Sequence, residues 1–193
     1  MNLKFVNQAI PKLDGAALTG GKGVYTEDMV PRDCLVVQVL RSPHARIKSI
    51  RKDAASRVPG ISCILTWEDV PQIRYTLAGQ SYPEPSPYDR YILERTVRYV
   101  GDPVAIVAGR DKDCVAKAMG MIQVKYDILK PVLDFETALD NPVVVHPEED
   151  YFHHFDIGGD PKRNLVSSGC DSDGDVDAAF AACDVVVDHT YYT

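Results

Sequence analysis

The sequence lacks long apolar runs and paired cysteines. Residues 1–8 have no apolar core of about seven residues, as a signal peptide would, and no segment approaches the ~20 apolar residues of a membrane-spanning helix. The cysteines are odd in number and form no C-x-x-C pair: Cys34, Cys63, Cys114, Cys170 and Cys183. This scatter favours reduced, mostly buried thiols over disulfides or an iron–sulfur site. We therefore predict a cytoplasmic protein that does not enter a membrane.

Common signatures of hydrolase, nucleotide and calcium sites are also missing. There is no G-x-S-x-G motif, which excludes the usual hydrolase nucleophile turn. The glycine-rich segment 15–23 does not fit a phosphate-binding loop, because Gly21 stands where lysine belongs, and we interpret it as a turn. The aspartate-rich segment 171–182 has Val176 and Ala182 where a calcium loop needs glycine and glutamate. It predicts instead a helix start with carboxylates at its positive end.

Charge is distributed unevenly along the chain. The net charge of −7 argues against nucleic-acid binding, because contacts with phosphate depend on Lys and Arg. Residues 1–133 hold 19 Lys and Arg against 14 Asp and Glu, whereas residues 134–193 hold 2 against 14. This change predicts a compact domain followed by an acidic arm. The arm is either a solvated loop region or a segment that packs against another domain or subunit.

The hydrophobic pattern predicts an α+β domain with a mixed sheet. Residues 1–33 are expected to form an irregular lead-in, because their glycines and prolines occur in clusters. Short strands are expected at 35–40, 47–50 and 61–66, the first of them well buried. Asp53 is expected to cap one or two helical turns through Val58, which should end at the P-G pair that follows.

A strand, a helix and a strand over residues 104–128 form the clearest predicted unit. The apolar run 104–108 is typical of a strand buried on both faces. Asp111 or Asp113 can cap the next helix, whose apolar residues fall at helical spacing: Val115, Ala118, Met119 and Ile122. If the two strands pair in parallel, their crossover should be right-handed. In the irregular acidic arm we expect a short strand at 143–145, a long loop at 146–173, a helix after Asp175 and a strand at 184–188.

Five ordered motifs resemble one known family. They are G-x-Y-T-x-D at 23–28, R-S-P-H-A-R-I at 41–47, P-G-I at 59–61, Y-V-G-D-P-V-A at 99–105 and V-K-Y-D at 124–127. In this order they resemble the amino-terminal α/β hammerhead domain of the molybdenum-binding subunit of the xanthine dehydrogenase and aldehyde oxidase family. The family most often has glutamine where this chain has Asp102. In the acidic arm the matching positions are His146-Pro147, Asn164, Gly174-Asp175, Phe180 and 183–191.

The resemblance implies a hammerhead domain over residues 20–133 and an acidic connecting arm over 134–193 that leads toward molybdopterin-binding domains. It implies an enzyme that hydroxylates a C–H bond of an aldehyde or nitrogen heterocycle with oxygen from water. Molybdenum held by molybdopterin would perform the reaction, and electrons would leave through iron–sulfur clusters and often FAD on partner domains or subunits.

In that family the molybdenum-binding loops and the catalytic base follow the hammerhead domain. We therefore assign no catalytic, cofactor-binding or metal residue in this chain. The expected role is that of a domain or fragment with structural and subunit-docking functions and no activity alone. The alternative is a stand-alone binding or assembly module with the same fold and no redox activity.

Two groups of side chains remain candidate sites. His146, His153 and His154 lie among carboxylates and are the best metal candidates, but a solvated acidic loop is the favoured interpretation of these residues. A basic run, together with Asp102, is a candidate docking surface for the acidic arm, a partner subunit or a pterin dinucleotide phosphate. It could equally be a solvated face; its residues are Arg41, Arg46, Lys48, Arg51, Lys52 and Arg57. His44 is expected to anchor the turn within this run.

Overall fold

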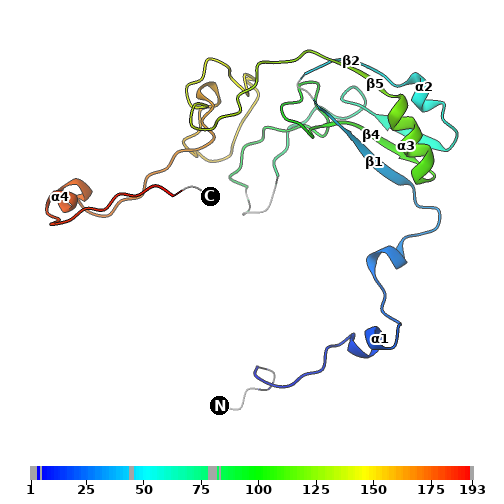
Figure 1. Cartoon of the computed structure of the whole chain (residues 1–193), viewed down its shortest axis with the longest axis horizontal. Helices are drawn as coiled ribbons and strands as arrows, with labels where there is room; N and C mark the ends of the chain where they lie inside the picture. The colour runs from blue at the N-terminus through cyan, green and yellow to red at the C-terminus, as the bar shows by residue number, and fades with distance from the viewer. Residues whose placement is uncertain (1–3, 5, 44–45, 78–81, 83, 192–193) are drawn as a thin grey trace. The chain divides into compact units, whose positions relative to one another are not determined.

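The computed structural model describes residues 4, 6–43, 46–77, 82 and 84–191. It divides into two compact units that alternate along the chain: the first comprises 1–40, 50–65 and 105–124, and the second comprises 41–49, 66–104 and 125–193. Its helices and strands follow one another along the chain, and Figure 1 labels most of them. In order they are α1 (Gly15–Thr19), η1 (Thr26–Met29), β1 (Val36–Arg41), β2 (Ile47–Arg51), α2 (Asp53–Ser56), β3 (Ile61–Leu65), β4 (Pro103–Gly109), α3 (Lys112–Met121), β5 (Gln123–Tyr126), η2 (Pro161–Arg163) and α4 (Val176–Ala181).

β4 is the central strand of a three-stranded sheet with the order β1-β4-β3, and β3 runs antiparallel to it with Ile64 opposite Val107. Val104, Ala105 and Val107 are fully buried, as the continuous apolar run predicts for a central strand. β2 and β5 form a separate two-stranded sheet. The strand, helix and strand at 104–128 are thus confirmed as elements, but β4 and β5 belong to different sheets and do not pair.

The core of the first unit lies where α2 and α3 contact β3 and the sheet. It consists of Ala55, Val58, Ile64, Val107, Cys114, Val115 and Ala118. α3 begins where predicted, because the Asp111 carboxylate accepts a hydrogen bond from the Cys114 backbone N–H at 2.8 Å. Gly109 permits this packing: a Cβ there would lie 2.8 Å from the Cys114 Sγ and 2.9 Å from Val115.

Two predictions about burial were wrong. β1 was expected to be well buried, yet the Val37 side chain is 57% exposed. β1 is an edge strand, so it has a neighbour on one side only, and the described residues leave Val37 uncovered. The cysteines were expected to be mostly buried, but only Cys114 is; the exposed ones are Cys34, Cys63, Cys170 and Cys183. Helix α2 begins at Asp53, but Lys52 occupies the N-cap position, so Asp53 is not the cap.

The predicted helix after Asp175 is confirmed as α4, and the Asp175 carboxylate accepts from the Ala178 N–H at 2.9 Å. The strands expected at 143–145 and 184–188 were wrong, because the described part of the chain forms neither. A strand requires a neighbour to pair its backbone, and hydrophobic pattern alone does not supply one. No described helix has the length and apolarity to cross a membrane.

Candidate functional site

Arg98 in the second unit joins the loop before β4 to the acidic arm. Its guanidinium forms ion pairs with Glu94 and Glu148, and its Nε donates to the Val145 carbonyl at 3.3 Å. The Arg98 side chain is only 12% exposed. A guanidinium has five N–H donors in a planar fork, so it can bind both carboxylates and backbone carbonyls together.

Glu148 has a strongly perturbed acidity. Burial raises its pKa, but the neighbouring His146 imidazole and the Arg98 charge outweigh burial and lower the pKa to about 2. The His146 Nδ1 lies 3.7 Å from the Glu148 Oε2, which is too long for a hydrogen bond, whereas the Arg98 guanidinium pairs directly with the Glu148 Oε1. Glu148 therefore stays ionised at neutral pH and holds a structural contact.

A second arginine fixes the same acidic segment. Arg74 donates to the Asp150 carboxylate at 2.6 Å, and the Tyr91 hydroxyl donates to its other oxygen at 2.5 Å. The Arg74 guanidinium also lies over the Tyr91 ring, 4.5 Å from its centroid. The hydrogen bonds from Arg74 and Tyr91 lower the pKa of Asp150 to about 2, and the bond to Asp150 raises the pKa of Tyr91. Residues 145–150 are thus packed against their own unit and are not a free loop.

Asn164 organises the next part of the arm. It follows η2 with a positive φ of 56°, which Asn tolerates better than most residues. Its side-chain oxygen accepts from the Val145 N–H at 2.9 Å, and its amide donates to the carbonyls of Ala138 and Val143 at 3.0 and 2.9 Å. These three bonds close the 138–145 loop onto residue 164. The sequence marked Asn164 only as a position in the family motif.

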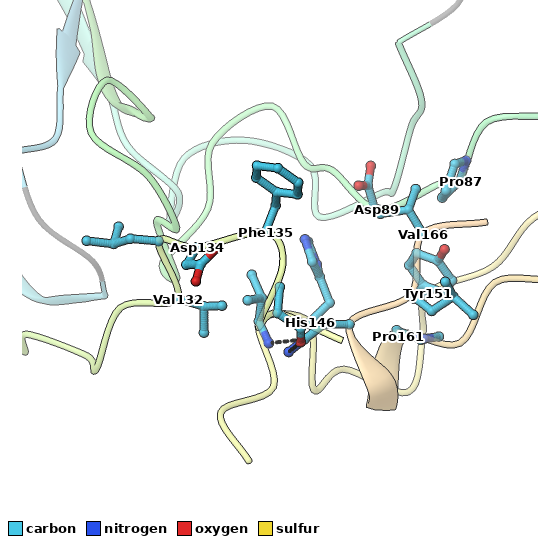
Figure 2. A pocket seen from close by; sticks show the side chains of 14 residues that line it. Pro87, Asp89, Val132, Asp134, Phe135, His146, Tyr151, Pro161 and Val166 are labelled. Carbon is cyan, nitrogen blue, oxygen red and sulfur yellow. Dashed lines mark hydrogen bonds between the residues drawn. The ribbon is translucent and has the colours of Figure 1, made fainter. Parts of the chain in front are cut away.

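A cavity of about 390 Å³ lies beside this loop, and we call it the apolar cavity. Figure 2 shows Phe135, His146 and Tyr151 around it. Most of its lining is apolar, with Asp89, Asp134, His146, Tyr151 and Asn164 as the polar members. The remaining lining residues are Pro87, Val132, Leu133, Phe135, Ala138, Val145, Pro161, Leu165 and Val166. Its volume falls in the range of roughly 300–1,000 Å³ typical of binding pockets.

The structure separates the three candidate metal-binding histidines by their contacts. His146 faces Glu148, His153 packs edge-on against Tyr151, and His154 packs edge-on against Tyr88 and Phe152. Among the residues that the structure describes, no three His, Cys, Asp or Glu side chains gather as a metal site would require. The carboxylates of Glu148 and Asp150 already bind arginines. Metal binding by these histidines stays a hypothesis.

Several side chains of the predicted docking surface contact the chain itself. Arg41 donates to the Gly101 carbonyl at 2.8 Å, Lys48 lies 3.5 Å from Asp127, and Lys52 donates to the Ile64 carbonyl at 3.1 Å. The Asp102 carboxylate, at the position where the family usually has glutamine, accepts a hydrogen bond from the Arg98 backbone N–H at 2.8 Å. The exposed members of the run are Arg41, Arg46, Lys48, Arg51 and Arg57. The predicted role of His44 lies outside the described residues.

Residues 20–130 match the family model described as "Aldehyde oxidase and xanthine dehydrogenase, a/b hammerhead domain". The chain belongs to this family. The predicted family and the α+β hammerhead fold are therefore confirmed. The curated relatives of this hammerhead chain include the probable hypoxanthine oxidase XdhD of Escherichia coli strain K12, which is 35% identical over 98% of the chain and 23% of that protein. They also include the nicotinate dehydrogenase large molybdopterin subunit of Eubacterium barkeri, 30% identical over 94% of the chain and 39% of that protein.

Comparison with solved structures also identifies the hammerhead fold. Quinoline 2-oxidoreductase from Pseudomonas putida 86 is 27% identical, with a TM-score of 0.57 over 70% of this chain and 18% of that one. The aldehyde oxidoreductase from Desulfovibrio gigas shares the fold at 23% identity, with a TM-score of 0.59 over 71% of this chain and 16% of that one. The chain thus spans about a quarter of the length of XdhD.

Two cavities of the second unit do not fit molybdopterin. That cofactor carries a phosphate, which needs cations or a row of N–H donors. The apolar cavity is lined by two aspartates and by neither Lys nor Arg. A second cavity, of about 250 Å³, has Arg90 and Arg98 in its lining, but Asp89, Glu94 and Asp102 lie beside them. We therefore derive no step through the cofactor from this chain.

Proposed function

We propose that this chain is the hammerhead region of a molybdenum hydroxylase, with a structural and docking role, and that residues outside it perform the reaction. The observation that carries the proposal is the match across 98% of the chain to a probable hypoxanthine oxidase, of which the chain covers only 23%. The domain boundaries at 20–133 and 134–193 belong to the same proposal.

The complete enzyme would bind molybdopterin and take oxygen from water to hydroxylate a C–H bond. Hypoxanthine, nicotinate and quinoline occur in the names of three relatives, and all three molecules are nitrogen heterocycles. This supports a heterocycle as substrate over an aldehyde. Iron–sulfur and FAD domains or subunits would receive the electrons, and we place the assembly in the cytoplasm.

The contacts of the acidic arm support a structural role. A carboxylate that acts as a general base must be able to take up a proton near neutral pH. Glu148 and Asp150 each have a pKa of about 2 and bind Arg98 and Arg74. They are suited to holding the arm in place and poorly suited to proton transfer.

The test is an activity assay on the purified chain. Supplied with molybdenum cofactor, an electron acceptor and hypoxanthine, nicotinate or an aldehyde, the folded chain should show no hydroxylation. Circular dichroism and Trp67 fluorescence would establish that the protein assayed is folded. Turnover by this chain alone would overturn the proposal.

The apolar cavity favours one alternative, a stand-alone binding or assembly module without redox activity. That alternative predicts that the chain isolated from its own cells carries no molybdenum and associates with no molybdenum-containing polypeptide. Our proposal predicts the opposite in both measurements.

A further inference from the structure

Three apolar side chains that line the apolar cavity are largely exposed. Leu133 is 89%, Phe135 83% and Val166 70% exposed. Other lining residues, such as Val132 and Leu165, are half-buried. Exposed apolar side chains grouped around a hollow are typical of an interaction site, because water alone covers them poorly. The cavity therefore has an apolar mouth as well as an apolar interior.

Two carboxylates lie in the described lining of the cavity, and an arginine outside that lining, Arg90, pairs with one of them. Asp89 and Asp134 contribute to the lining, and none of the described lining residues is Lys or Arg. Asp134 accepts hydrogen bonds from the Glu136 N–H at 3.0 Å and the Thr137 hydroxyl at 3.1 Å, so it is engaged within its own turn. Asp89 has a looser partner, the Arg90 Nε at 3.8 Å. This arrangement disfavours an anionic occupant and favours a cation beside the cavity.

Hydrogen-bonding groups of the cavity are only partly satisfied within the chain, because the His146 Nδ1 is buried without a hydrogen-bond partner among the described residues. The Asn164 side chain uses its oxygen and its amide on backbone groups of residues 138–145. The Tyr151 ring packs against His153, with the ring centroids 6.2 Å apart. Recognition can therefore use the apolar shape of the cavity, its two aspartates and the His146 imidazole. An aromatic group fits such a site because it buries a large apolar area with few lost rotamers.

We propose that the apolar cavity receives an aromatic side chain from a basic segment of a partner polypeptide. This inference rests on the docking role proposed above and names the surface through which that role acts. A small free ligand would leave Leu133, Phe135 and Val166 exposed around the mouth, whereas a polypeptide can cover them. The two aspartates then face the cations that flank the aromatic anchor.

The test is a fluorescence-anisotropy titration of the full chain with two labelled peptides, Lys-Lys-Trp-Lys-Lys and Glu-Glu-Trp-Glu-Glu, and a competition with tryptamine. We expect the basic peptide to bind at least about tenfold more tightly than the acidic one, and added salt to reduce this difference. Tryptamine, which has the same aromatic and cationic groups without a polypeptide, should compete only weakly.

Variants of the chain test whether the basic peptide binds at the apolar cavity. Leu133→Ala and Asp89→Asn should each weaken binding of the basic peptide by about fivefold to tenfold. Leu13→Ala removes a fully exposed leucine elsewhere, and Asp113→Asn removes an aspartate on α3; neither should change the affinity.

Three results would overturn the inference: no binding of the basic peptide, equal binding of the two peptides, or displacement by tryptamine at the concentration at which the peptide itself binds. The last result would identify a small-molecule site. If the peptide experiment gave one of these results and the native assembly contained molybdenum, the inference about the apolar cavity would be refuted and the proposed function would still hold.

Discussion

Protonation of Glu148 should destabilise the second unit in a defined pH window. The folded-state pKa is about 2, against an ordinary value of 4.5. Above pH 4.5 the carboxylate is ionised in both the folded and the unfolded chain, so its stabilising contribution is complete. As the pH falls below 4.5, the unfolded chain binds the proton first, and the contribution is lost until it vanishes near pH 2.

The size of this effect follows from the same two values. A pKa that falls from 4.5 to about 2 corresponds to at most roughly 3 kcal/mol of stability at neutral pH, and the part due to His146 is smaller because that contact is 3.7 Å long. The Glu148 side chain is 24% exposed and its partner Arg98 is 12% exposed, so solvent screening reduces this figure only in part. Between pH 4.5 and pH 3 the loss should be at most about 1.5 kcal/mol.

The assay is urea unfolding of the wild type and of Glu148→Gln, followed by fluorescence of Trp67, the one tryptophan of the chain, which lies in the second unit. The stability difference between the two proteins should be largest near pH 7 and should decrease by about 1–1.5 kcal/mol from pH 4.5 to pH 3. Glu149→Gln, which changes the adjacent exposed glutamate, should follow the wild type. Parallel pH profiles for the wild type and Glu148→Gln would refute the reasoning.

Two further predictions concern the packing of each unit. Gly109→Ala should destabilise the first unit by more than about 1 kcal/mol, because the new methyl group would lie under 3 Å from Cys114 and Val115. Gly120→Ala on α3 should instead stabilise this unit by up to about 1 kcal/mol. Thermal unfolding that shifted the stability of both variants in the same direction would contradict this prediction. Asn164→Ala should lower the free energy of unfolding by roughly 2–3 kcal/mol and expose the Val145 amide to hydrogen exchange, because three hydrogen bonds disappear. Asn164→Gly, which tolerates the positive φ but also lacks the side chain, should regain little of this stability. Unchanged exchange at Val145 would show that other contacts hold the loop.

Local signals predicted the first unit well. The apolar run of β4 and the Asp111 cap of α3 each depend on a few consecutive residues, and the structure confirms both predictions. Burial of β1 was predicted wrongly, because the coverage of a strand depends on neighbours that are remote in sequence. Val37 alternates like a buried residue but lies on an edge strand.

The contacts of the acidic arm could not be predicted from the sequence pattern. Arg98 meets Glu148 across 50 positions and Arg74 meets Asp150 across 76, and no periodicity links such pairs. The carboxylates of 148–150 were therefore interpreted as solvated or as metal ligands. A usable signal was present in the concentration of arginines before β4, at Arg74, Arg90, Arg95 and Arg98, which gives an acidic segment local partners.

The molybdenum content of the native assembly tests the central claim most directly. The chain would be isolated from its own cells with an antibody raised against it, and molybdenum would be measured against the amount of chain. The account predicts an equimolar amount of molybdenum in the material that contains the chain. Chain recovered in quantity without molybdenum would contradict the account and favour the stand-alone module.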